Sequence, residues 1–569
     1  MTQFSNLYTK IGKNLSGTPW NVYPRPNLKR NSFLNLNGKW DFTVTNGETP
    51  KEYNRKILVP FPPESLLSGI NEVFSEDIFL WYKTEFSINQ EFIKDKVILH
   101  FGAVDQIAEV FLNGKFIGNH VGGYEAFCFD ITEYLSEKNT LVVKVKDELS
   151  KNILPYGKQS AKRGGMWYTR VSGIWQTVWL ESVPNEYIKS LKTKVGLNYA
   201  EITVNGIQNG EITVRTEEGD IKKKIENGFV RIDIEEPVNW TPENPYLYNF
   251  KITANNDEVE SYFALRTVEI AEIEGINRIL LNKKPYFFHG LLDQGYWSDG
   301  LFTPASEEGF IDDIKAVKSL GFNMLRKHIK VEPELFYYYC DLLGIAVFQD
   351  MVNNSNYSFI RDTALPTVTF ARKNDKNSHK NPLSRKAFID GMESEVRQLY
   401  NHPSILCWTI FNEGWGQFCA DDMYDRLKKL DSSRLIDSAS GWFKSSKNDF
   451  ESLHVYFRKL KIKPSTKPIF ISEFGGYSYK IKEHSFNKDK TYGYGKYENR
   501  EDFVKAFCSL YENQVLPLVE KGLCATVYTQ VSDVEDETNG ILTYDRKVQK
   551  ITAQEFLHIS EKLCKNNEK

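Results

Sequence analysis

The pattern of apolar and polar positions changes once along the chain, at about residue 278. Before that point, short segments such as 97–101 and 108–112 alternate apolar and polar residues and are separated by turn signals. Alternation with a period of two predicts strands that bury one face. Asn113-Gly114, directly after the second segment, is a strong signal for a β-hairpin. We therefore expect a jelly-roll β-sandwich over residues 1–185.

Residues 186–275 continue the strand-like pattern, with turn signals at Asn209-Gly210 and Glu218-Gly219. The size of this segment and the spacing of its turns are typical of a small immunoglobulin-like sandwich. We expect it to form a second β domain.

After residue 278 the pattern alternates between short apolar runs and helical periods. Phe310, Ile314, Val317 and Leu320, for example, share one face of a predicted helix. Eight apolar runs are candidate strands: 286–291, 322–326, 345–350, 405–411, 435–439, 452–456, 469–473 and 524–529. Eight strands separated by helical or helix-length segments predict a (β/α)₈ barrel over residues 276–569.

Two glutamates stand at the ends of predicted barrel strands. Glu413 follows the fourth strand and Glu473 ends the seventh. The carboxyl ends of barrel strands meet at one rim, and barrel enzymes keep their chemistry there. We expect the two carboxylates to converge, which is the arrangement that cleaves a glycosidic bond.

Composition narrows the classes of function. The net charge of −3 gives no electrostatic case for binding nucleic acid or an anionic membrane. No run of about 20 apolar residues predicts a membrane span, and the first residues lack an apolar signal core. The seven cysteines form no Cys-x-x-Cys pair, which fits free thiols in a reducing compartment. We expect a cytoplasmic protein.

Several motifs occur in an order and at separations that resemble those of glycoside hydrolase family 2. They are Tyr23-Pro-Arg-Pro-Asn27, Gly38-Lys-Trp-Asp-Phe42, Gly173-Ile-Trp-Gln176, Asn412-Glu413-Gly414, Ser472-Glu473-Phe474-Gly475 and Asn539-Gly-Ile-Leu-Thr-Tyr-Asp-Arg546. The family contains β-galactosidases, β-glucuronidases and β-mannosidases. The resemblance covers nearly the whole chain and implies a jelly roll, an immunoglobulin-like sandwich and a catalytic barrel in that order.

The resemblance also implies roles for individual residues. Glu413 would be the acid/base and Glu473 the nucleophile of a retaining mechanism, which needs carboxyl groups about 5–5.5 Å apart. Asn412 would bind the sugar 2-hydroxyl. Tyr456 would donate a hydrogen bond to the nucleophile, and Arg326 would hold its carboxylate ionised.

Further candidates for substrate contact have a competing structural explanation. Trp442 and Tyr528 offer aromatic faces for a sugar ring, but aromatic residues also fill cores. His454 faces the same predicted cleft or is a structural histidine. His289 and Asp293 lie at the end of the first strand, where this chain departs from the Arg-Gly-x-Asn-x-His pattern of the family. Asp293 could bind sugar hydroxyls or be an ordinary loop acid.

The departures from the family pattern bear on the sugar. β-Glucuronidases hold the uronate with an Asn-x-Lys motif, and no lysine stands two positions after Asn539. Lys327 and His328 offer positive charge at another part of the rim, so a uronic acid stays open. Residues 350–356 lack the Glu-x-His pair that binds magnesium in large galactosidases. We expect no essential metal and no cofactor, and a hard-cation site built from Asp350 and neighbouring Asn oxygens is the weaker alternative.

Together these features predict a retaining exo-β-glycosidase acting on a small carbohydrate substrate, with terminal β-D-galactosyl residues as the first candidate. The alternatives within the family are a β-glucuronidase, a β-mannosidase or an α-L-arabinopyranosidase. A non-catalytic carbohydrate-binding protein is the alternative of another class, and the presence of both glutamates argues against it. The resemblance also implies a homo-oligomer, either a dimer or a tetramer.

Overall fold

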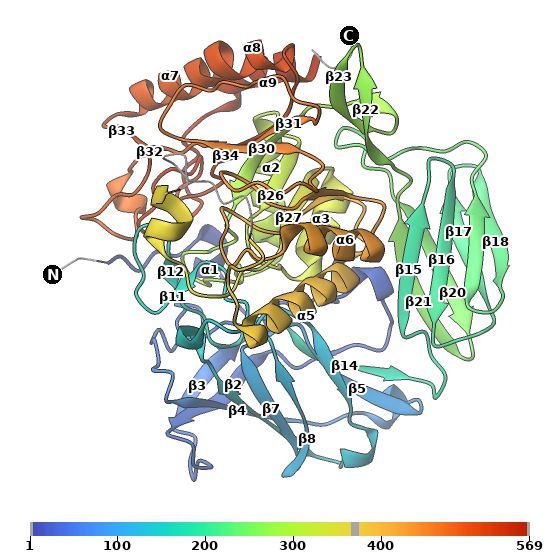
Figure 1. The fold of residues 1–569 in the computed structure, drawn as a ribbon. Helices are drawn as coiled ribbons and strands as arrows, with labels where there is room; N and C mark the ends of the chain where they lie inside the picture. Colours follow the sequence, from blue (N-terminus) through green and yellow to red (C-terminus); the bar gives the residue numbers. More distant parts are fainter. Residues whose placement is uncertain (1–3, 366–374, 566–569) are drawn as a thin grey trace.

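The computed structural model describes residues 4–365 and 375–565. Figure 1 shows a barrel with its outer helices in yellow to red, the N-terminal sandwich in blue below it and a second sandwich in green beside it. This arrangement confirms the expected fold class. Among the described helices, none has the length and apolar character that a bilayer span requires.

The N-terminal sandwich consists of a six-stranded sheet of order β3-β2-β4-β10-β7-β8 and a four-stranded sheet of order β1-β14-β5-β9. Alternate residues of β10, such as Leu141 and Val143, are buried between the sheets. The predicted hairpin joins β7 to β8, and Asn113 and Gly114 both have positive φ, as its tight turn requires. The strands are β1 Leu34–Asn35, β2 Gly38–Thr45, β3 Arg55–Val59, β4 Phe79–Phe86, β5 Lys96–Phe101, β6 Val104–Asp105, β7 Ile107–Leu112, β8 Lys115–Val121, β9 Phe127–Asp130, β10 Asn139–Lys146, β11 Gln159–Ser160, β12 Tyr168–Thr169, β13 Gly173–Ile174 and β14 Val178–Val183.

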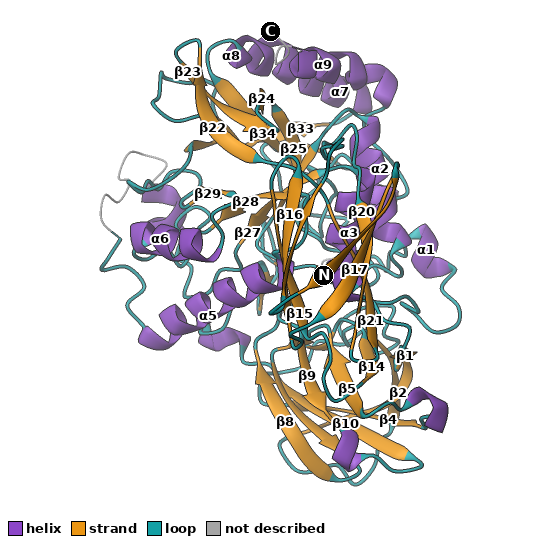
Figure 2. Ribbon diagram, turned by 90° about the vertical axis from the view of Figure 1, so that its right-hand side faces the viewer, coloured by secondary structure: helices purple, strands orange, loops and turns teal. Residues whose placement is uncertain are grey.

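The second sandwich packs a three-stranded sheet, β15-β16-β19, against a four-stranded sheet, β18-β17-β20-β21. Its strands run antiparallel, and the two sheets are seen edge-on in Figure 2. A three-stranded ribbon, β22 to β24, leads from it into the barrel. The strands are β15 Ser190–Val195, β16 Tyr199–Asn205, β17 Gly210–Thr216, β18 Gly219–Ile225, β19 Phe229–Asp233, β20 Tyr248–Ala254, β21 Asp257–Phe263, β22 Val268–Ile273, β23 Ile276–Leu281 and β24 Lys284–Pro285.

All eight expected barrel strands are present, each within two residues of its predicted bounds. They form one parallel sheet of order β29-β28-β27-β26-β25-β34-β31-β30, so the first strand pairs with the last and only β29 and β30 lack a ladder between them. The strands are β25 Phe288–Asp293, β26 Met324–Lys327, β27 Ala346–Asp350, β28 Ile405–Thr409, β29 Leu435–Asp437, β30 Glu451–Val455, β31 Ile469–Gly475 and β34 Leu523–Thr529.

Helices cover the outside of the barrel, and the predicted face of α2 is buried as expected. The described helices are α1 Lys10–Lys13, α2 Glu308–Ser319, α3 Glu334–Leu343, α5 Pro382–Leu399, α6 Ala420–Leu430, α7 Arg500–Leu510, α8 Leu516–Val519 and α9 Ala553–Lys565. The connections after β29 and β30, residues 438–450 and 456–468, contain no helix. These connections are short, polar and interrupted by Gly441 and Pro464, so the regular alternation of strand and helix fails there.

Candidate active site

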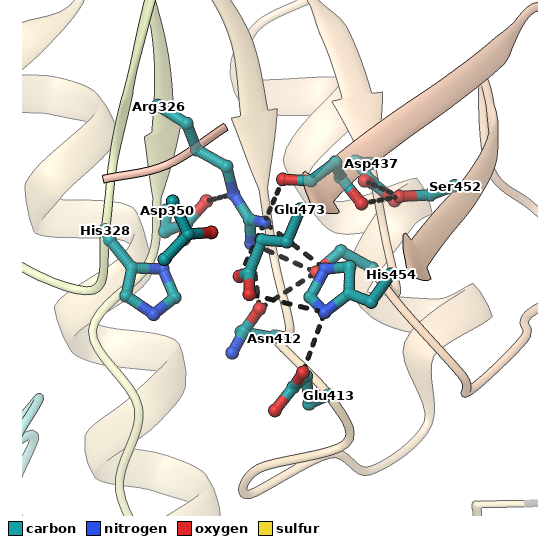
Figure 3. A network of polar contacts seen from close by, with 12 residues as sticks. Arg326, His328, Asp350, Asn412, Glu413, Asp437, Ser452, His454 and Glu473 are labelled. Carbon is teal, nitrogen blue, oxygen red and sulfur yellow. Dashed lines mark hydrogen bonds and ion pairs between the residues drawn. The ribbon is translucent and has the colours of Figure 1, made fainter. Parts of the chain in front are cut away.

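A network of polar side chains occupies the carboxyl end of the barrel (Figure 3). Its members come from five strands or from the residues directly after them, and each is buried. They are Arg326, Asp350, Asn412, Glu413, His454 and Glu473. The parallel register brings these positions to one rim although they are spread over about 150 residues of sequence.

Arg326 is the centre of this network. Its side chain is 0% exposed, and its Nε donates to Asp350 Oδ1 at 2.9 Å. One terminal nitrogen donates to Glu473 Oε1 at 3.0 Å, and the other donates to Asn412 Oδ1 at 2.9 Å and Ser440 Oγ at 3.0 Å. Because the guanidinium is rigid and planar, it fixes the relative positions of the strand ends that it joins.

Glu473 is held as an ionised carboxylate. Tyr456 donates a hydrogen bond to Oε2, opposite the Arg326 bond to Oε1. Burial by itself would raise the pKa of Glu473, but His454 and Arg326 outweigh it and hold the pKa below the usual range. A buried carboxylate that stays charged and oriented is suited to act as a nucleophile.

Glu413 stands on a turn directly after β28. Its φ is +49°, a left-handed conformation that a non-glycine residue rarely adopts. The turn aims the side chain back at the rim, where Oε1 lies 2.7 Å from His454 Nδ1. An oxygen of Glu413, an oxygen of Glu473 and a ring nitrogen of His454 all lie within 4.8 Å of one another.

The same three residues are the one group of His, Cys, Asp or Glu side chains, among those described, with the spacing of a metal site. Arg326 and Tyr456 already donate to Glu473. A metal ion would have to share that carboxylate with the guanidinium and would be repelled by its charge. The donor set therefore suits a proton-transfer pair better than a metal centre.

Asn412 and Trp442 belong to the same cluster. Asn412 Oδ1 accepts hydrogen bonds from Arg326 and from Ser440, so the amide nitrogen Nδ2 is the part that is left to donate to a ligand. The Trp442 ring packs edge-on against His454 with centroids 5.5 Å apart. Both Trp442 and Tyr456 line a cavity of about 580 Å³ beside the open edge of the barrel.

Two expected residues lie elsewhere. Phe288 and Val527 face the barrel interior, so His289 and Tyr528, their neighbours on β25 and β34, face the outer helices. The His289 ring packs on Phe322 at 4.1 Å, and burial lowers its pKa to about 3. The Tyr528 hydroxyl accepts a hydrogen bond from the Tyr477 amide. Neither side chain contacts the carboxylate cluster, and we remove both from the candidate set.

Asp293 is a third expected residue that lies away from the site. Its carboxylate accepts a hydrogen bond from Lys327 Nζ at 2.8 Å, and Lys327 also pairs with Glu332. This network lies outside the barrel wall, so neither Asp293 nor Lys327 faces the cluster. His328, by contrast, adjoins it, because its Nδ1 lies 2.7 Å from Asp350 Oδ2. Burial lowers the pKa of His328 to about 4, which keeps the ring neutral near pH 7.

Some residues of the site carried no signal in the sequence. Tyr494 comes from the loop that joins β32 (Tyr477–Tyr479) to β33 (Gly495–Tyr497) and stacks on Tyr456 with centroids 3.9 Å apart. Lys158 comes from the N-terminal sandwich and reaches the barrel rim. Their positions depend on long loops and on domain contacts, which periodicity cannot reveal.

Comparison with protein families identifies the chain. The model for the TIM barrel domain of glycosyl hydrolases family 2 matches residues 271–560. The sugar binding domain of that family matches residues 67–184, and a further family 2 model matches residues 185–266. The chain therefore belongs to glycoside hydrolase family 2, as its motifs suggested.

The relatives are named for different activities. A β-galactosidase of Thermoanaerobacter pseudethanolicus is 28% identical over 464 residues, which cover 73% of this chain and 58% of that protein. A putative β-glucuronidase of Formosa agariphila is 28% identical over 357 residues, covering 58% of this chain and 39% of that protein. The chain thus aligns with only part of the length of these relatives.

Solved structures match the fold over nearly the full length. A β-D-glucuronidase of Dictyoglomus thermophilum has a TM-score of 0.72 at 19% identity, covering 95% of this chain and 98% of that one. A β-galacturonidase of Eisenbergiella tayi has a TM-score of 0.67 at 19% identity, covering 96% and 98%. At such low identity these likenesses concern the fold alone.

Proposed function

We propose that this protein is a retaining exo-β-glycosidase and that terminal β-D-galactosyl residues are its first candidate substrate. The observation that carries the proposal is the approach of Glu413 and Glu473 to within 4.8 Å. Retaining glycosidases have carboxyl groups about 5–5.5 Å apart, whereas inverting enzymes leave about 6.5–9.5 Å for a water molecule. The short separation favours covalent catalysis.

The proposed reaction has two steps. Glu473 attacks the anomeric carbon, while Glu413 gives its proton to the departing glycosidic oxygen. Glu413, now a carboxylate, takes a proton from water, and the resulting hydroxide displaces Glu473 and releases the sugar with its β configuration kept. Arg326 and Tyr456 hold the nucleophile in position before the attack.

His454 has a place in this scheme because it lies between the two carboxylates. Its Nδ1 is 2.7 Å from Glu413 and 3.5 Å from Glu473. When the covalent intermediate forms, the negative charge moves from Glu473 to Glu413. His454 can interact with whichever of the two carboxylates is charged. We assign it a positioning role.

The galactosyl candidate is supported by the β-galactosidase named among the relatives and by the missing Asn-x-Lys motif at Asn539. A β-hexuronidase is the second candidate, because a putative β-glucuronidase aligns at the same identity. The homo-oligomeric state and the cytoplasmic location expected from the sequence stay predictions.

A panel of nitrophenyl glycosides tests the activity, and a 2-deoxy-2-fluoro glycoside tests the mechanism. We expect turnover of the β-galactoside and a covalent adduct on the peptide that contains Glu473. Glu473→Gln should lose both, whereas Glu393→Gln, at a partly exposed position of α5 that pairs with Arg397 and Arg426, should keep both. Retained sugar binding without turnover of any glycoside would instead support the non-catalytic alternative.

A further inference from the structure

A loop of the jelly roll, residues 152–170, completes the rim of the barrel. The Tyr156 amide donates, at 3.0 Å, to the carbonyl of Asn353, which lies in the loop after β27. Arg163 donates to Asp536 at 2.6 Å, and the Tyr168 hydroxyl donates to Glu537, both in the segment after β34. The loop is therefore held on two sides of the candidate active site.

Gly157 permits this close approach. Its φ is +66°, and a Cβ atom there would lie 2.7 Å from the carbonyl oxygen of Ile329, two residues after the end of β26. Only glycine fits such a conformation and such a contact. The chain thus passes directly over the barrel rim, and the next residue, Lys158, points into the site.

Lys158 is a buried cation that packs on aromatic rings. Its relative exposure is 7%, and its Nζ lies 4.8 Å above the Trp415 ring, two residues after Glu413. Within the described residues, Nζ makes no ion pair and no hydrogen bond. Burial lowers the pKa of Lys158, and the neighbouring carboxylates of Glu537, Glu473 and Glu413 oppose that lowering. The ammonium nitrogen is not fully occluded, so its donors face the open space of the site, where hydroxyl groups of a ligand can accept them.

Glu537 supplies the complementary group. Tyr168 and Gln530 both donate to its Oε2, the latter at 3.3 Å. No described residue donates to Oε1. A donor and an acceptor that face the same space can together bind neighbouring hydroxyl groups.

We propose that Lys158 and Glu537 bind hydroxyl groups of a neutral hexose, so that the jelly roll takes part in substrate selection. The charges around Lys158 favour a neutral sugar over a hexuronic acid. With Glu413 protonated, as the proposed mechanism requires, two cations, Lys158 and Arg326, stand among three carboxylates, those of Glu537, Glu473 and Asp350. A uronate would meet more negative than positive charge in this space. This inference rests on the proposed function.

The test compares Lys158→Met with Lys162→Met, the same change at an exposed lysine of the same loop. Methionine keeps the apolar stem over Trp415 but has no donor. For the nitrophenyl β-galactoside, we expect kcat/KM of Lys158→Met to fall about 10- to 100-fold, the effect of a lost hydrogen bond to a charged group. Lys162→Met should match the wild type, and thermal unfolding checks that both variants are folded.

Substrates that lack one hydroxyl group complete the test. The 6-deoxy sugar (β-D-fucoside) and the α-L-arabinopyranoside remove the groups at carbon 6. If Lys158 binds the hydroxyl group at carbon 6, the wild type should hydrolyse these two substrates more slowly than the β-galactoside. Lys158→Met, which has already lost that contact, should show little difference between them and the β-galactoside. A 4-deoxy-galactoside makes the same comparison for the hydroxyl group at carbon 4. A wild type that prefers a β-glucuronide or β-galacturonide, with the preference lost in Lys158→Met, would overturn the neutral-sugar assignment. Equal kcat/KM of wild type and Lys158→Met on every substrate would overturn the role of Lys158.

Calorimetric binding of galactose and galacturonate separates this inference from the proposed activity. If no glycoside is hydrolysed, the proposed function fails, yet weaker galactose binding by Lys158→Met than by Lys162→Met would still support the hydroxyl contact. If hydrolysis occurs and both variants bind galactose equally, the Lys158 inference fails alone.

Discussion

Replacing Arg326 with methionine should change the pH dependence of hydrolysis as well as the stability of the fold. The guanidinium donates five hydrogen bonds, two of them to the buried carboxylates of Asp350 and Glu473. Removing one partner of a buried ion pair typically costs about 3–5 kcal/mol, because a buried charge is left uncompensated. We therefore expect the free energy of unfolding to fall by about that amount.

The effect on Glu473 is more specific. An adjacent arginine lowers the pKa of a carboxyl group by about 1–3 units. Without Arg326 the pKa of Glu473 should rise by a similar amount, since burial then acts with less opposition. As the proposed nucleophile, Glu473 must be ionised, so the acid limb of kcat/KM should move to higher pH by about 1–3 units.

Arg434 provides the matched control. It is also buried and forms an ion pair with Asp431 at 2.8 Å, but it does not touch the carboxylate cluster of Glu413 and Glu473. Arg434→Met should lose comparable stability and keep the acid limb of the wild type. The assay is a pH profile of nitrophenyl glycoside hydrolysis together with thermal unfolding. Coincident acid limbs for all three proteins, or an equal shift in both variants, would refute the reasoning.

Four further predictions follow from the same contacts. Glu413→Gln should lower hydrolysis about 100- to 10,000-fold, and azide should restore turnover of substrates with good leaving groups; no rescue would exclude Glu413 as the acid/base. Tyr456→Phe should lower kcat about 10- to 100-fold through the lost hydrogen bond to the nucleophile, and unchanged kcat would contradict this role. His289→Phe should leave kcat/KM unchanged while altering thermal stability, since its ring packs under the helices; a loss of activity in the folded variant would return it to the site. Burial raises the pKa of Glu64 from 4.5 to about 8, so the folded state binds the extra proton and loses stability as pH rises between these values, at most about 1.4 kcal/mol per pH unit. In denaturant titrations at pH 5 and 8, the free energy of unfolding of Glu64→Gln should change less between the two pH values than that of the wild type. An equal change in both proteins would contradict this prediction.

The corrections among the candidate residues have a common cause. Adjacent residues on a strand face opposite sides of the barrel wall, so the direction of a side chain depends on a register of one residue. The pattern placed the strands of His289 and Tyr528 within two residues, which is not accurate enough to decide the face. In the structure both side chains point outward, whereas Arg326 and Glu473 point inward.

The sequence by itself determined the order of the three parts, the eight barrel strands and the two glutamates that end the fourth and seventh of them. These features follow from local periodicity and from chain order, which a single sequence records directly. Only the tertiary structure decided that Lys158, more than 250 residues before Glu413, lies near the carboxylates of Glu413 and Glu473. That proximity depends on how one domain packs on another, through contacts between loops whose composition follows no period.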